Sequence, residues 1–239
     1  MSIRKYIPDS ITSLNLLCGT LGIVAALGGR LDYAFYLMLS GAVFDFCDGL
    51  AARMLGAYSD MGKELDSLAD VVTFGVLPAV MMSTLMKACS FSTGIICLMP
   101  LLIAVFAGLR LAKFNVDPRQ GSGFIGLPSP AGAVICGSLC YFVASTPAGF
   151  LCTLASGMWF IPAVSVALCI LLVCGIPMFS MKFHKDDPKV LVHKRIAFAV
   201  NCVLCILIVA LTGQNWSLAV FLAFVVYVAM NMVFAIFKI

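Results

Sequence analysis

Four aspartates with regular spacing are the residues of this sequence best suited to chemistry. Asp45 and Asp48 are three residues apart, and Asp66 and Asp70 are four residues apart. Residues three or four apart share one face of a helix, so each pair would present its two carboxylates together. Hard cations such as Mg²⁺ and Mn²⁺ prefer carboxylate oxygens and commonly bridge them to substrate phosphates. The spacing therefore predicts a divalent-metal site that acts on a phosphate-containing substrate.

The stretch from Asp45 to Asp70 is acidic in a chain that is otherwise apolar. Six of the 11 acidic residues fall within it, whereas 62% of the 239 residues are hydrophobic and 11% are charged. Soluble proteins carry charges on roughly a quarter of their residues, so this composition predicts an integral membrane protein. Because an ionisable residue in or beside a membrane helix is costly, its presence there favours a functional site.

We expect an all-α membrane protein with eight spans, because about 20 helical residues cross a hydrocarbon core of ~30 Å. The expected spans are residues 10–27, 33–55, 61–86, 91–114, 131–143, 160–177, 196–211 and 217–237. We treat residues 1–239 as one membrane domain whose metal and nucleotide site lies on the helices of residues 33–114. Residues 1–9 form either a short interfacial helix or a plain basic anchor.

The basic residues predict the orientation of the chain. With the N-terminus inside, 13 of the 15 Lys and Arg residues fall on the side of both termini, and Arg30 and Lys87 fall on the other. By the positive-inside rule both termini are cytoplasmic, and the acidic stretch opens on the cytoplasmic face of the inner membrane. We expect the lipid bilayer, and no nucleic acid, as a partner.

The 11 cysteines lie almost entirely within the apolar spans. There they behave as small hydrophobic residues. Cys202 and Cys205 form a CxxC in the middle of a span, without a Cys or His at metal-ligand spacing. We therefore expect no redox or zinc role for them.

Small residues accompany the acidic pairs. Gly49, Ala51 and Ala52 leave one side of the helix without bulk, Arg53 lies one turn beyond Gly49, and a turn with Gly56, Ser59 and Gly62 follows. This arrangement gives room for a nucleotide-sized group with Arg53 on a phosphate. The alternative is a structural network in which the aspartates pair with Arg53 and Lys63 and the small residues serve helix packing.

These residues match a known signature. The chain resembles the CDP-alcohol phosphotransferases, whose signature DxxDGxxARx8GxxxDxxxD it matches at every fixed position, namely Asp45, Asp48, Gly49, Ala52, Arg53, Gly62, Asp66 and Asp70. Four further blocks resemble the members that use serine: PDSITSLNLLCGTLGI, ELDSLADVVTFGVLPA, LRLAKFNV and FIGLPSPAGA.

The resemblance implies an enzyme that transfers the phosphatidyl group of CDP-diacylglycerol to the hydroxyl of serine and releases CMP. It implies that Asp45, Asp48 and Asp66 hold the metal, with two Mn²⁺ or Mg²⁺ ions. Asp70 would both border the metals and act as the general base toward serine. A homodimer is implied as well.

The resemblance also assigns the substrates. CDP-diacylglycerol would be bound by Thr12, Asn15, Asp48, Gly49, Arg53 and Ser59. The serine candidates are Arg110, Lys113 and Asn115, among which Arg110 could hold the carboxylate bidentately. The alternative for this trio is a positive-inside cluster.

Two other functions compete with this one. A sister enzyme could use glycerol 3-phosphate or inositol phosphate, although a phosphorylated acceptor needs an additional cationic pocket. A cation transporter could also gather carboxylates, but it would place them near the middle of the membrane. Here they lie in the cytoplasmic halves of the expected spans, which favours the enzyme.

Overall fold

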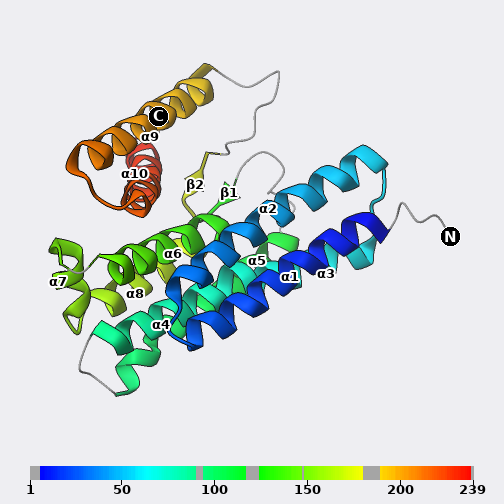
Figure 1. Ribbon diagram of the computed structural model, residues 1–239. Helices are drawn as coiled ribbons and strands as arrows, with labels where there is room; N and C mark the ends of the chain where they lie inside the picture. Colours follow the sequence, from blue (N-terminus) through cyan, green and yellow to red (C-terminus); the bar gives the residue numbers. More distant parts are fainter. Residues whose placement is uncertain (1–5, 90–93, 117–123, 147, 180–188, 238–239) are drawn as a thin grey trace.

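The computed structural model describes residues 6–89, 94–116, 124–146, 148–179 and 189–237, which are almost entirely helical (Figure 1). The N-terminal helices are α1 (Tyr6–Leu27), α2 (Leu31–Leu55), α3 (Asp60–Asp70), η2 (Val71–Val76) and α4 (Leu77–Cys89). They are followed by η3 (Ile95–Leu101), α5 (Leu102–Val116), α6 (Ser129–Ser145), α7 (Phe150–Ser156), α8 (Phe160–Val173), α9 (Lys189–Thr212) and α10 (Trp216–Phe237). Residues 6–9, expected to belong to an interfacial segment, form the first turn of α1.

The segments α3, η2 and α4 form one continuous helix at the centre of the bundle. It spans Asp60–Cys89. Within its most apolar stretch of 18 residues, 61% is buried inside the protein, which is the largest share among the long apolar helices described. Its middle segment, η2, is a π-helix that begins directly after Asp70. A π-turn inside an α-helix is rare and often marks a functional site, because it changes which side chains face each neighbour.

The helices α2 and α3 are joined by a tight turn at the end of the bundle where the carboxylates lie. Gly56 ends α2 with φ +58°, a left-handed conformation that glycine adopts without steric cost. Ser59 then begins α3, and its side-chain oxygen accepts a hydrogen bond of 2.9 Å from the Gly62 amide. The two capped ends reverse the chain, so that α2 and α3 both pack against α1.

A short antiparallel sheet, β1 (Phe124–Ile125) and β2 (Pro177–Met178), ties together two distant parts of the chain. The turn after β1 lies against the end of α8, where the Leu127 amide donates to the Leu171 carbonyl at 2.8 Å. Gly126 has φ +80°, and a Cβ there would lie 2.7 Å from the Leu172 carbonyl oxygen. Glycine is therefore required at this point by both conformation and space.

The last helix, α10, connects the C-terminal hairpin to the bundle. It packs against both α9 and α6. Asn231 accepts a hydrogen bond of 2.9 Å from the Phe179 amide, and the Tyr227 hydroxyl donates to the Phe179 carbonyl at 3.0 Å. The segment that follows β2 is therefore fixed to α10 by two buried contacts.

Each expected span contains a helix, but the count of eight membrane crossings is not confirmed. Within the described ranges, six segments are long and apolar enough to cross a membrane, and the pair α6 and α7, bent by 102°, is a seventh if it forms one span. α8 has 14 residues, which is shorter than the ~20 of a straight crossing. The short helix α7 lies where no element was expected.

Candidate active site

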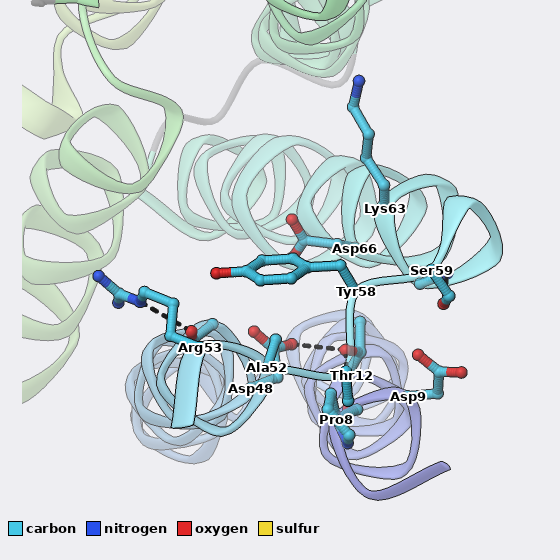
Figure 2. Close-up of a pocket in the computed structure, with 13 residues that line it drawn as sticks. Pro8, Asp9, Thr12, Asp48, Ala52, Arg53, Tyr58, Ser59, Lys63 and Asp66 are labelled. Atoms are coloured by element: carbon cyan, nitrogen blue, oxygen red, sulfur yellow. Dashed lines mark hydrogen bonds between the residues drawn. The ribbon is translucent and has the colours of Figure 1, made fainter. Parts of the chain in front are cut away.

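Three carboxylates converge between α2 and α3. One oxygen of each of Asp45, Asp48 and Asp66 lies within 4.8 Å of the others. The pairs three and four residues apart thus do meet across the two helices, as the spacing predicts. Figure 2 shows Asp48 and Asp66 on the facing sides of these helices, with Thr12 of α1 beside Asp48. The Thr12 hydroxyl donates a hydrogen bond of 2.6 Å to the Asp48 carboxylate.

Asp70 lies one turn deeper than Asp66 on the same helix. It is close enough to Asp45 and Asp66 to interact electrostatically with both carboxylates. One buried oxygen of Asp66 and one of Asp70 have no hydrogen-bond partner among the described residues. The two helices thus present a deeper pair, Asp45 and Asp70, and a shallower pair, Asp48 and Asp66.

This donor set fits a divalent cation. Closely spaced carboxylates repel one another, and buried oxygens without partners cost free energy, unless a cation neutralises them. Among the described residues, neither Arg53 nor Lys63 forms a salt bridge with the aspartates. The Arg53 Nε instead donates to the Gly49 carbonyl at 2.9 Å, and Lys63 points away from Asp66 in Figure 2. The alternative of a structural ion-pair network is therefore not supported.

A cavity of about 400 Å³ opens beside the shallower pair. Its size is within the range of small-molecule sites. It is lined by Pro8, Asp9, Thr12, Asp48, Gly49, Ala52, Arg53, Ala57, Tyr58, Ser59, Gly62, Lys63 and Asp66. Five of the six residues that we expected to contact the nucleotide therefore share one cavity.

Two glycines at this cavity have different surroundings. A Cβ at Gly49 would approach nothing closer than the Arg53 Nη2, at 4.0 Å. A Cβ at Gly62 would lie 2.6 Å from an Asp9 carboxylate oxygen and 2.9 Å from the Ser59 hydroxyl. A side chain at Gly62 would therefore have to displace the Asp9 carboxylate and the Ser59 hydroxyl, whereas the protein alone leaves space at Gly49.

The sixth expected nucleotide residue, Asn15, does not line this cavity. It is fully buried one turn deeper in α1, and its amide has no hydrogen-bond partner among the described residues. The backbone carbonyl of Asn15 accepts a hydrogen bond of 3.1 Å from Thr73 of η2. A Cβ at Gly41 would lie 2.9 Å from the Asn15 side-chain oxygen. Asn15 thus lies where α1, α2 and η2 meet.

The three serine candidates on α5 are in different environments. Arg110 is 7% exposed, its Nη1 donates to the Ser129 hydroxyl at 3.0 Å, and Asp70 lies within electrostatic range. Its Nε is buried without a partner, and no salt bridge to a described carboxylate is present. Lys113 is exposed, and exposed Asn115 donates to Ser67 of α3 at 2.9 Å.

Sequence reasoning missed several residues of the site. Asp9 and Tyr58 line the cavity, and Ser129 holds Arg110. Asp9 stands directly before the first expected span. An acidic residue at that position indicates that its side chain lies at the same end of the bundle as Asp48. Ser129 lies in the FIGLPSPAGA block, but nothing in that block indicates its contact with Arg110, which is 19 residues away in sequence. Tyr58 directly precedes Ser59, and this position in the turn was the available signal.

The comparisons with known proteins agree with this geometry. The family model described as CDP-alcohol phosphatidyltransferase matches residues 5–171. The chain belongs to the CDP-alcohol phosphatidyltransferase family. Family membership, together with several long apolar helices, makes it an integral membrane protein. It also favours the enzyme over the cation transporter.

Relatives within this family have names that mention serine. The chain is 42% identical over 126 residues to the CDP-diacylglycerol–serine O-phosphatidyltransferase of Bacillus subtilis. The aligned region covers 53% of this chain and 70% of the relative. It is 33% identical over 196 residues to the protein of that name from Methanocaldococcus jannaschii, covering 75% of this chain and 90% of the relative. An archaetidylserine synthase of Methanothermobacter thermautotrophicus is 39% identical over 130 residues, covering 54% of each chain.

We predict that Mn²⁺ binds at the convergent carboxylates and raises the melting temperature of the purified protein, because a ligand of the folded state stabilises it. Asp66→Asn removes one ligand oxygen and should lower the Mn²⁺ affinity by about tenfold or more, since even indirect partners of metal ligands contribute that much. The measurement is melting temperature against Mn²⁺ concentration in detergent. Exposed Glu64 on the same helix provides the control Glu64→Gln. An Asp66→Asn response equal to that of the control would refute this site.

Proposed function

We propose that this chain transfers the phosphatidyl group of CDP-diacylglycerol to the hydroxyl of L-serine, giving phosphatidylserine and CMP. The observation that carries the proposal is the arrangement around Asp70. Asp70 lies within electrostatic range both of the convergent carboxylates and of the buried Arg110, which forms no salt bridge with a described carboxylate. The cavity opens beside Asp48 and Asp66. The names of the relatives support serine as the acceptor and CDP-diacylglycerol as the donor.

The nucleotide half of the site is the cavity between α1, α2 and α3. Arg53 and the hydroxyls of Thr12 and Ser59 supply polar groups there, and Gly49 leaves the backbone open to a close approach. Tyr58 is 70% exposed at the same cavity, so its ring is available to stack on a base. We assign Asn15 instead to the support of the helices beneath the carboxylates, since it does not line the cavity.

The metal half is formed by Asp45, Asp48 and Asp66, with Asp70 at its border. These residues would hold one or two Mn²⁺ or Mg²⁺ ions. Such ions, when bound, neutralise the negative charge that develops on the phosphoryl oxygens. The hydrogen bond from Thr12 orients the Asp48 carboxylate, so α1 contributes to the ligand geometry.

Asp70 is the proposed general base. A serine hydroxyl is a weak nucleophile at neutral pH and needs a base within hydrogen-bond reach. One oxygen of Asp70 is buried and has no partner among the described residues, so it is available to accept the hydroxyl proton. The serine oxygen then forms its bond to phosphorus as the bond to CMP breaks.

Arg110 is the proposed ligand of the serine carboxylate. A buried guanidinium without a direct salt bridge is costly, so an anionic ligand at this position would be stabilised. Lys113 is exposed and Asn115 is bonded to Ser67, and both lie further along α5 toward the surface. We therefore give Arg110 the main role in binding the acceptor.

We also propose the orientation that the basic residues predict. Both termini and the active site face the cytoplasm, and eight helices cross the inner membrane. A water-soluble acceptor and a lipid-anchored nucleotide can both reach a site at that surface. The assembly is proposed to be a homodimer, as the family resemblance implies.

The acceptor spectrum tests the proposed function directly. Purified protein with CDP-diacylglycerol and Mn²⁺ should release CMP when serine is added. Glycerol 3-phosphate, inositol and inositol phosphate, offered separately, should give no release above the background without acceptor. Release with a phosphorylated acceptor and none with serine would instead identify a sister enzyme.

The second prediction concerns Asp70. Asp70→Asn keeps the size of the side chain but removes the base, so the rate of CMP release should fall by about 100-fold or more. The variant should still bind CDP-diacylglycerol. This binding is measured as the rise in melting temperature that the lipid causes. Full activity of this variant would exclude Asp70 as the base.

The third prediction separates acceptor binding from donor binding. Arg110→Ala removes charge-assisted hydrogen bonds of roughly 1.5–3 kcal/mol, so the KM for serine should rise on the order of 10- to 100-fold. The KM for CDP-diacylglycerol should change much less. Exposed Lys87, at the far end of α4, provides the control Lys87→Ala. An unchanged serine KM in Arg110→Ala would show that Arg110 does not bind the serine carboxylate.

A further inference from the structure

Two positively polarised groups lie together at Ser129, and neither is in a salt bridge with a described carboxylate. One is the Arg110 guanidinium, which is buried and has no salt bridge to a described carboxylate. The other is the N-terminus of α6, a helix of 17 residues that begins at Ser129. The free amides and the dipole of a helix N-terminus favour negative charge. Both groups would therefore be stabilised by the same anion.

Ser129 connects these two groups. It is 1% exposed, and its hydroxyl accepts a hydrogen bond of 3.0 Å from Nη1 of Arg110. A guanidinium has five N–H donors, and a carboxylate can be bound through the edge formed by Nε and Nη2. Because Ser129 occupies Nη1 and the Nε has no partner, the contact leaves that edge for a ligand.

The position of Ser129 is fixed from several directions. The turn before it is held by the Gly126 amide, which donates to the Ile176 carbonyl at 2.9 Å, and by the contact of Leu127 with the end of α8. β2 pairs with β1, and the next residue, Phe179, is held by Asn231 and Tyr227 of α10. Tyr227 itself lies within electrostatic range of Arg110. Helices α8 and α10 therefore hold the turn that presents the Ser129 hydroxyl.

We infer that Ser129 is a positioning residue for the acceptor: it holds Nη1 of Arg110 so that the remaining edge of the guanidinium takes the carboxylate of an amino-acid alcohol. This inference rests on the proposed function and goes beyond it, because it assigns acceptor specificity to a residue that lies outside the catalytic helices. The acceptor class is a small hydroxylated amino acid whose carboxylate binds at Arg110 while its hydroxyl faces Asp70.

The test is the kinetics of the full-length protein with Ser129→Ala and Ser129→Thr. Ser129→Ala should raise the KM for serine on the order of threefold to tenfold, the usual effect of losing one such hydrogen bond. The KM for CDP-diacylglycerol and the kcat at saturating serine should stay within about twofold of wild type, because the donor half is untouched. Ser129→Thr keeps the hydroxyl and should restore most of the serine affinity.

Ser138 provides a matched control on the same helix. It is fully buried, and its hydroxyl bonds to the Val134 carbonyl within α6, away from Arg110. Ser138→Ala removes the same group from the same helix and should leave the serine KM unchanged. A general loosening of α6 would raise the serine KM in both variants, which would overturn the inference.

A double-mutant cycle with Arg110→Ala decides whether Ser129 acts through Arg110. If it does, the double variant should be no worse for serine than Arg110→Ala alone, since the contact is already lost. Any residual rate of CMP release with ethanolamine as the acceptor should be the same in Ser129→Ala and wild type, because ethanolamine lacks the carboxylate. Additive effects, or an equal loss with ethanolamine, would refute the inference.

The experiment also separates this inference from the proposed function. If wild type uses serine and Ser129→Ala has an unchanged serine KM, the inference fails and the proposed function stands. If wild type releases CMP only with acceptors that lack a carboxylate, the proposed function and the inference fail together.

Discussion

The repulsion among carboxylates at one end of an apolar bundle is the constraint on which the rest of the site depends. Oxygens of Asp45, Asp48 and Asp66 lie within 4.8 Å of one another, and Asp70 is close behind them. In a medium of low dielectric constant such a group is unfavourable without a cation. Among the described residues, neither Arg53 nor Lys63 forms a salt bridge with these aspartates, and neighbouring elements hold the carboxylates in position. Thr12 orients Asp48, and the close approach of α1, α2 and η2 at Gly41 and Asn15 holds the backbones in place.

Asp70 divides the site into two halves that different parts of the chain build. The donor half comes from α1, α2 and α3, consecutive elements whose geometry is set by the turn at Gly56 and Ser59. The acceptor half comes from α5, α6 and α10, with β1, β2 and α8 behind them. The proposed acceptor is a zwitterion, and its carboxylate would lie at Arg110 while its hydroxyl lies at Asp70. A site divided in this way can vary the acceptor half and keep the chemistry of the donor half unchanged.

Local patterns predict the meeting of Asp45, Asp48 and Asp66 and the residues of the cavity beside them, but not the contacts of Arg110. Spacings of three and four residues are enough to place each aspartate pair on one helix face, and the turn between α2 and α3 brings Asp66 to Asp45 and Asp48. Apolar length likewise predicts the long helices, although it gives no warning that α8 is short or that α7 is present. The π-helix after Asp70 and the partner of Arg110 depend on tertiary packing. Ser129 meets Arg110 because the turn before it docks on the end of α8 and on the segment before β2, and α10 in turn holds the residue after β2. None of these contacts is local in the sequence.

The two signature glycines at the cavity show how packing and ligand binding can be told apart in a shared motif. Gly62 is explained by the protein itself, because Asp9 and Ser59 occupy the space that a side chain would need. Gly49 is not explained in this way, since a Cβ there would contact only the far end of Arg53. Glycine also lowers helix stability by roughly 1 kcal/mol relative to alanine. A helical glycine that is open to a cavity and adjacent to Asp48, a proposed metal ligand, is therefore best explained by something outside the chain that must approach the backbone. The nucleotide of the proposed donor meets that requirement, and a purely structural network of charges does not.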